Sequence, residues 1–195
     1  MARKVPTQRR LGFQQLETRE CMAGDVHVTY TGGTLSLKGD GASNQVSVVW
    51  NGTGYTVAGI GTTINHSNQP FFSGPITKDL VVDLTAGDDY LLLANINVGR
   101  NVDIKTGTGN DQVIWQNGSV RGNCSINTDG DNDDLTVNNV QVANNFNVEM
   151  TSGNDTARIN LVTAKRASIN GGTGKNTLAT FAANKFSSLE LKNFK

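Results

Sequence analysis

Residues 100–121 read RNVDIKTGTGNDQVIWQNGSVR and contain the unit that decides the fold. Val102 and Ile104 alternate with charged residues, which is typical of a strand with one apolar face. A turn rich in Gly and Asn follows, because both residue types tolerate positive φ. Val113 and Trp115 then mark a second strand, and an Asn-Gly turn leads to a third. The unit therefore predicts three short strands within 22 residues.

The same pattern recurs every 22 residues along most of the chain. One acidic column and two apolar columns stay in phase with one another. The acidic column is Asp89, Asp111, Asp133 and Asp155, followed after 21 residues by Asn176, and the apolar columns begin Leu80, Val102, Cys124, Phe146 and Val82, Ile104, Ile126, Val148. Repeats that stack in this way form a solenoid. The predicted fold is all-β: a single-stranded, right-handed parallel β-helix with about 22 residues per coil.

The chain divides into two parts by composition. Residues 1–24 are basic at their start and predict a disordered or sorting-type segment. Residues 25–195 carry the β-helix, and the stretch at about 51–77 is interpreted as an irregular coil with a distorted loop. We expect Cys124 to be a small core residue and not to pair with Cys21, because it lies in an apolar column.

Bulk composition excludes several classes of protein. The 17 basic residues balance the 17 acidic ones, so no overall field favours nucleic acid. No apolar run approaches the roughly 18 residues of a transmembrane helix, so no membrane span is expected. Motifs for a Ser/His/Asp triad, a zinc protease or a phosphate-binding loop do not occur, and outward acids do not pair with a base. The sequence predicts no enzyme.

The stretch from Leu11 to Ala23 resembles the N-terminal LExR-x-LLA segment of large exported proteins of planctomycete-type bacteria. Leu16, Glu17 and Arg19 match that segment, whereas Cys21 and Met22 stand where two leucines are usual. The resemblance implies export or sorting to the cell envelope. It implies no chemistry.

The acidic column carries the most distinctive chemistry of the sequence. Carboxylates one strand spacing apart repel one another by about 1 kcal/mol per neighbour even in water. Exposure to solvent, raised pKa values or bound cations would offset this repulsion, and calcium suits a set of Asp, Asn and carbonyl oxygens. The alternative is that the turns simply direct their carboxylates to water. The candidate metal ligands are Asp88, Asp89, Asn110, Asp111, Asp129, Asp131, Asp133 and Asp155.

These turns also resemble the calcium-binding RTX nonapeptide GGxGxDxUx. Residues 106–114, TGTGNDQVI, match it from its second Gly, and residues 171–179 keep the glycines but lack the Asp. RTX rolls carry two nonapeptides in each 18-residue coil, whereas this chain has one in 22. The resemblance implies calcium along one edge of the solenoid.

The function expected from these features is a non-catalytic structural or adhesive module, extracellular or on the cell surface, that calcium stiffens. The alternatives are a carbohydrate-active β-helix similar to polysaccharide lyases and a glycan-binding module. Expected partners are surface glycans or envelope components. Because Leu189 and Leu191 continue the apolar columns close to Lys195, end-to-end self-association is a further expectation.

Overall fold

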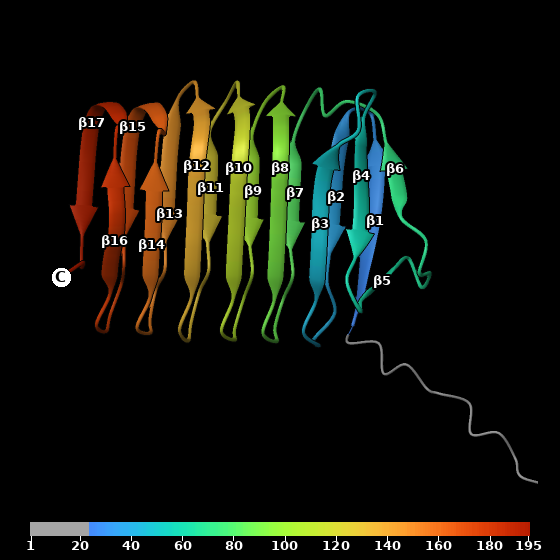
Figure 1. Cartoon of the computed structure of the whole chain (residues 1–195), viewed down its shortest axis with the longest axis horizontal. Coiled ribbons are helices and arrows are strands. Elements are labelled where there is room, and N and C mark those ends of the chain that lie inside the picture. The colour runs from blue at the N-terminus through green and yellow to red at the C-terminus, as the bar shows by residue number, and fades with distance from the viewer. Residues whose placement is uncertain (1–23) are drawn as a thin grey trace, which may run out of the picture.

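The computed structural model describes residues 24–195, which form a stack of β-coils in which no residue is helical (Figure 1). Each coil has one strand on its first face and another on its second, and in the central coils the second strand is the longer. The first-face strands are β2 (Thr34–Lys38), β7 (Leu80–Asp83), β9 (Val102–Lys105), β11 (Cys124–Asn127) and β13 (Asn145–Glu149). The second-face strands are β3 (Gln45–Trp50), β8 (Tyr90–Val98), β10 (Gln112–Val120), β12 (Asp134–Val142), β14 (Thr156–Asn160) and β16 (Thr177–Ala182). In the last coils, β15 (Thr163–Asn170) and β17 (Lys185–Lys192) run into the first face.

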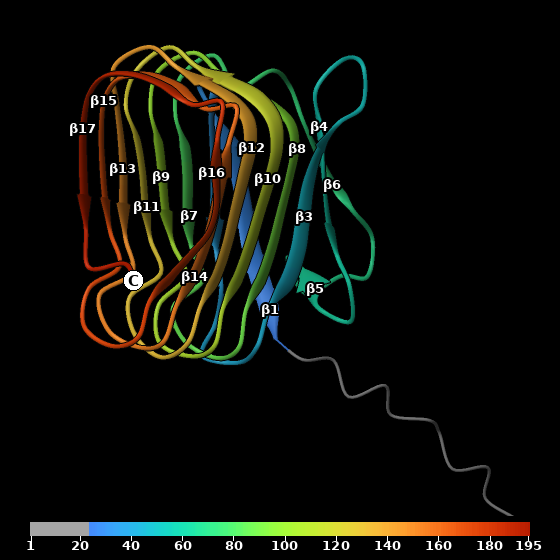
Figure 2. The same cartoon turned by 60° about the vertical axis from the view of Figure 1, so that its left-hand side comes forward.

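Strand pairing confirms the predicted register and the β-solenoid. Cys124 of β11 pairs in parallel with Val102 of β9 and with Phe146 of β13, each 22 residues away. On the second face, Val113 of β10 pairs with Leu91 of β8 and Leu135 of β12. The coils lie side by side as nested loops in Figure 2.

The second and third predicted strands of a coil are continuous in β8, β10 and β12. The chain bends between them at one residue with positive φ, which is Asn95, Asn117 or Asn139 (φ 56–60°). Asn tolerates this left-handed conformation better than most residues. The predicted Asn-Gly turn is therefore a bend at one residue within a continuous strand. In a later coil the bend lies at Leu161 (φ 54°), and there it separates two strands, β14 and β15.

The core consists of the predicted apolar columns. Residues that alternate inward on each face, such as Leu91, Val113 and Ile126, are at most 1% exposed. Burial of such a side chain contributes about 1.5–3 kcal/mol. Cys124 belongs to this core and is a buried free thiol, as expected.

The irregular segment at about 51–77 differs from the prediction. It is not a coil, because β2 pairs directly with β7 (Leu35 with Leu80) and β3 with β8, across 45 residues. Instead, β4 (Tyr55–Gly59) turns back antiparallel on β3, and β6 (Phe71–Ser73) pairs antiparallel with β4.

The same end of the stack also holds β1 (Asp25–Thr31). This strand is antiparallel to β2 and pairs with β5 (Thr63–Ile64). Antiparallel strands that fold back in this way occupy the edge that a parallel stack would otherwise leave open. The irregular segment is thus part of an N-terminal cap, visible at the right of Figure 1.

The other end of the described chain has no comparable cover. Leu189 and Leu191 of β17 occupy the inward columns but are 43% and 42% exposed. The described part of the chain contains no helix that could cross a bilayer. The predictions for residues 1–23, including the sorting-type segment and Cys21, lie outside the described residues.

Candidate functional site: the acidic corner

The corner between the first and second faces is built from one six-residue turn that recurs in successive coils. Residues 106–111 show its geometry, and isolated parallel bridges join its third residue to the same position in neighbouring coils (Ala86 to Thr108, Thr108 to Gly130). Gly107 has φ of 101°, and a Cβ there would lie 1.7 Å from the carbonyl oxygen of Thr85. A side chain at Gly107 would therefore collide with the preceding coil, whereas Thr85, Asp129 and Thr151 occupy the same turn position in other coils, also with positive φ.

The predicted acidic column forms the inner row of this corner and is buried. Asp89, Asp111, Asp133 and Asp155 are 1–3% exposed. Each Oδ1 accepts a hydrogen bond from the backbone N–H of the equivalent residue in the preceding coil. Asp111 Oδ1 accepts from Asp89 N (2.8 Å), Asp133 Oδ1 from Asp111 N (2.9 Å) and Asp155 Oδ1 from Asp133 N (3.0 Å). The row therefore joins adjacent coils through one carboxyl oxygen of each residue. The alternative in which these carboxylates face water is wrong.

Asparagine stands at both ends of the inner row. Its Nδ2 atom occupies the position that Oδ2 has in the aspartates, and it shows which groups surround that position. Asn176 Oδ1 accepts from Asp155 N (2.9 Å), as each aspartate does from the coil before it. Its Nδ2 donates to the turn carbonyls of Gly171 (2.6 Å) and Asn193 (3.2 Å). Asn44 Nδ2 likewise donates to the carbonyl of Ala42 (2.7 Å). The second side-chain position at this corner thus faces backbone carbonyl oxygens.

In the four aspartates, that second position holds Oδ2, an acceptor. The Oδ2 atoms of Asp89, Asp111, Asp133 and Asp155 are buried and have no hydrogen-bond partner. A buried acceptor without a donor costs about 1–3 kcal/mol, and more when it is charged. The corner therefore calls for a positive charge, either a proton on each carboxyl group or a metal cation.

Burial raises the pKa of these carboxyl groups because the charged form loses hydration. The pKa of Asp89 rises to about 7, that of Asp111 to about 6 and that of Asp133 to about 7, and the pKa of Asp155 is also raised. Repulsion from neighbouring aspartates acts in the same direction on Asp89, Asp111 and Asp133. The hydroxyl groups of Thr106 beside Asp111 and of Thr128 beside Asp133, together with the backbone N–H donors, lower these pKa values without cancelling the rise.

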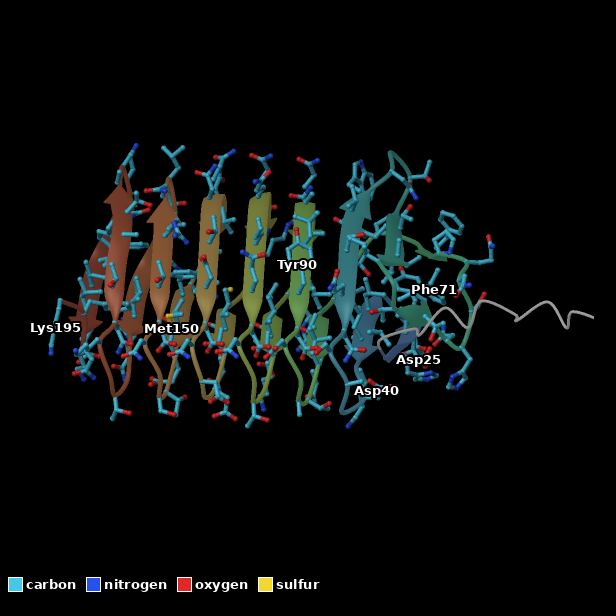
Figure 3. The ribbon with its side chains drawn as sticks, turned by 60° about the horizontal axis from the view of Figure 1, so that its bottom comes forward. Asp25, Asp40, Phe71, Tyr90, Met150 and Lys195 are labelled. Carbon is cyan, nitrogen blue, oxygen red and sulfur yellow. The ribbon has the colours of Figure 1, made fainter. Side chains whose placement is uncertain are left out.

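A second, outer row runs beside the inner one, one residue earlier in each turn. Asp88 Oδ1 accepts from Asn110 N (2.8 Å), Asn110 Oδ1 from Asn132 N (3.2 Å) and Asn132 Oδ1 from Asn154 N (2.8 Å). The outer row bonds toward the following coil and the inner row toward the preceding one. Each pair of coils is therefore joined in both directions at the same corner. Figure 3 shows the side-chain oxygens recurring coil after coil along this edge.

The structure divides the eight candidate ligands among three places. Asp89, Asp111, Asp133 and Asp155 form the inner row, and Asp88 and Asn110 belong to the exposed outer row. Asp129 and Asp131 lie exposed on one turn, both with positive φ (66° and 77°). Within residues 24–195, three or more acidic, His or Cys side chains do not meet in a group that could hold a metal. A metal here would depend on carbonyl oxygens as well as carboxyl groups.

Two members of the outer row, Asn132 and Asn154, were not among the predicted site residues. Their 22-residue spacing from Asp88 and Asn110 is the signal that could have found them. A third ladder lies at the opposite corner, where Asn101 Oδ1 accepts from Asn123 N (3.0 Å) and Asn123 Oδ1 from Asn145 N (3.3 Å). These Asn side chains are at least partly exposed, so this ladder does not pair polar groups of a buried corner.

The outward acids and bases do not build an obvious catalytic centre in the described chain. Asp134 and Arg158 form an ion pair on the second face. Glu149 accepts hydrogen bonds from Asn170 (2.8 Å and 3.0 Å) on the first face, and His66 lies beside Asp25 in the N-terminal cap (3.2 Å). These pairs lie on different faces and do not converge.

No protein-family model matches the chain, and comparisons with curated proteins and with solved structures likewise gave no match. The function is therefore argued from the chemistry of the molecule itself.

Proposed function

We propose that this chain is a non-catalytic structural module of an exported or cell-surface protein, in which rows of side chains tie successive coils into a stiff rod. One observation carries the proposal. The acidic residues with the most regular geometry, the inner row, direct one oxygen of each carboxyl group at the neighbouring coil. Their second oxygens are buried, so they are not available to a dissolved substrate.

The resemblance of Leu11 to Ala23 to envelope-sorting segments supports export. Labelling intact and permeabilised cells with an antibody against residues 24–195 tests this part of the proposal. We expect labelling of intact cells, and labelling only after permeabilisation would contradict it.

Calcium is proposed as the cation of the acidic corner. The unpaired Oδ2 atoms of Asp89, Asp111, Asp133 and Asp155 support it, together with turn carbonyls of the kind that Asn44 and Asn176 bind. Carboxylate and carbonyl oxygens are the ligands that calcium prefers. Calcium would take the place of the missing donors and stabilise the folded state by mass action.

Thermal unfolding of the chain in calcium and in chelator tests the cation. At pH 8 and about 100-fold excess of calcium over its dissociation constant, we expect stabilisation of about 2.7 kcal/mol, or about 5–10 °C in Tm for a domain of this size. The shift should shrink at pH 5, where protons occupy the same carboxyl groups. The double variant Asp111→Asn, Asp133→Asn should lose much of the shift, and the first-face variant Asp83→Asn, Asp103→Asn, which removes the same number of carboxylates, should keep it.

If calcium does not raise the Tm at either pH, calcium is not the cation of the acidic corner, and protons on the carboxyl groups compensate for the missing donors. That result would leave the proposed structural role unchanged. Release of unsaturated or reducing sugars from acidic polysaccharides would contradict the non-catalytic role itself. That result would favour the carbohydrate-active alternative.

A further inference from the structure

The third face of the solenoid consists of the parts of β8, β10 and β12 that follow their bends at Asn95, Asn117 and Asn139. The corner between this third face and the first lies opposite the acidic corner and carries cations in nearly every coil. Six exposed basic residues lie at this corner or at the end of the third face beside it, and we call them the basic edge: Lys78, Arg100, Arg121, Lys165, Arg166 and Lys185. In Figure 1 this edge is the upper one, where β8, β10 and β12 end. Among the exposed acids of the described chain, Asp88, Asp129 and Asp131 lie at the other corner, and Asp103, Glu149 and Glu190 lie on the first face.

Pairing places these cations in register along the axis of the solenoid. The backbone N–H of Arg100 donates to the carbonyl of Lys78 (2.8 Å), and that of Lys165 donates to Asn144, two coils further on (2.9 Å). Lys185 pairs with Thr163 at the last described coil. Because adjacent coils are about 4.8 Å apart, the five steps from Lys78 to Lys185 span about 24 Å. The basic edge is therefore a line of charge and not a point.

Most of this charge is uncompensated within residues 24–195. Asp79 is the acid of this corner, and it pairs with Arg100 (3.6 Å). Lys165 Nζ contacts the neutral Asn144 Oδ1 (3.2 Å). Arg121, Arg166 and Lys185 form no ion pair in the described chain. A row of unpaired cations attracts a polyanion more strongly than it attracts a single charge.

Two shallow hollows of about 380 and 370 Å³ lie along the same edge and share Ser119 and Arg121. Apart from Arg121, their polar lining is neutral, and four of its residues stack in successive coils through parallel pairing: Asn97, Ser119, Gln141 and Thr163. Ser119 Oγ donates to Asn97 Oδ1 (2.7 Å), which leaves the amide N–H groups of Asn97 available. A linear molecule along the axis would meet an amide or hydroxyl group at each coil.

We propose that the basic edge and these two hollows bind a linear acidic polysaccharide that lies along the solenoid axis. Carboxylate or sulfate groups of the polymer would face the cations, and its hydroxyl groups would bond to the amide and hydroxyl side chains. Nucleic acid fits less well, because the hollows have no aromatic side chain on which bases could stack. The inference deepens the proposed surface role, on which it rests, by naming a ligand class for it.

Binding of the full chain to polygalacturonate tests the proposal, with uncharged dextran and single-stranded DNA as comparison polymers. The edge variant is Arg121→Gln, Lys165→Gln, Arg166→Gln, which spares the paired Arg100. The matched control, Lys105→Gln, Lys175→Gln, Lys195→Gln, removes the same charge from other parts of the surface and likewise spares ion-paired residues. Circular dichroism and Tm should be unchanged in both, because all six side chains are exposed.

We expect polygalacturonate to bind in a salt-dependent way and dextran not to bind. The edge variant should lose about tenfold in affinity, as three exposed charge contacts would contribute, and the control variant less than about twofold. Equal losses in the two variants, no binding to polygalacturonate, or tighter binding to DNA would each overturn the proposal. Cleavage of the bound polymer would instead contradict the non-catalytic function, so the two failures are distinguishable.

Discussion

At the scale of single residues, the inner row uses the two oxygens of each aspartate in different ways. Oδ1 of Asp133 accepts from the neighbouring coil, whereas its Oδ2 is buried without a donor. Asn176 satisfies both positions, because its amide supplies the donor that a carboxylate lacks. Aspartate is therefore the less stable choice at this position unless a proton or a metal compensates for the missing donor.

Substitution of Asp133 tests this difference. In chelator at pH 8, Asp133→Asn should raise the Tm, because its Oδ1 keeps the hydrogen bond from Asp111 and its Nδ2 can donate to a turn carbonyl. Asp133→Ala should destabilise the fold by about 1–3 kcal/mol, because it leaves the Asp111 N–H without an acceptor. Thermal unfolding of the two variants measures both effects. Equal destabilisation by Asn and Ala would show that the second oxygen needs no donor.

Stability in chelator should depend on pH with a sign opposite to that of an ordinary salt-bridged aspartate. The pKa of Asp133 is raised from 3.8 to about 7, so the folded state binds protons more tightly than the unfolded chain. The contribution is complete below about pH 4 and is lost as pH rises toward about 7. One pKa unit on one carboxyl group corresponds to about 1.4 kcal/mol, so the loss should be at least that large.

Urea unfolding at pH 5 and pH 8 measures the effect, with a lower midpoint expected at pH 8. The double variant Asp111→Asn, Asp133→Asn should depend less on pH, because two of the raised carboxyl groups are gone. A midpoint that increases from pH 5 to pH 8 in the unsubstituted chain would contradict the assignment.

At the scale of elements, the six-residue turn determines how closely two coils can stack. Its glycines have distinct roles. Gly107 has positive φ and faces the Thr85 carbonyl, whereas Gly41 lies in the first described turn, where an added Cβ would have no atom within 4 Å. An added side chain would therefore meet the neighbouring coil at Gly107 but not at Gly41.

Alanine at these two glycines tests the role of the turn. Gly107→Ala should destabilise the fold by about 1–3 kcal/mol, because it combines a left-handed backbone with a clash. Gly41→Ala should change stability by less than about 0.5 kcal/mol. Chemical unfolding of both variants provides the comparison, and a similar cost in each would contradict the close-packing argument.

At the scale of the whole molecule, the two ends of the described stack differ. Antiparallel strands β1, β4 and β6 cover the N-terminal end, whereas β17 leaves Leu189 and Leu191 exposed. Exposed apolar residues on an open sheet edge favour association with another sheet. The predicted end-to-end contact between copies of this chain would use this end.

Light scattering coupled to size exclusion tests the contact. We expect the mass to increase with protein concentration, and Leu189→Lys with Leu191→Lys to reduce that increase. The variant Ile60→Lys with Phe72→Lys removes exposed apolar side chains from the N-terminal segment and serves as the control. A larger effect from the control than from the β17 variant would contradict the assignment.

The sequence alone determined the register, because a parallel stack repeats its chemistry at a fixed interval. The 22-residue spacing was enough to place Val102, Cys124 and Phe146 in one buried column, and a step of 21 residues placed Asn176 at the neutral end of the acidic one. Alternation along each strand also separated inward from outward residues.

Only the tertiary structure decided what each column faces. Sequence spacing places the four aspartates at one corner, but whether that corner opens to water depends on how the neighbouring turns close over it. The role of the irregular segment at about 51–77 in the N-terminal cap was also decided by the tertiary structure. Its strands pair antiparallel with the edge of the stack, and a repeat in the sequence does not predict such pairing. The cations of the basic edge are scattered in sequence, and only the coiling of the chain brings them into one line.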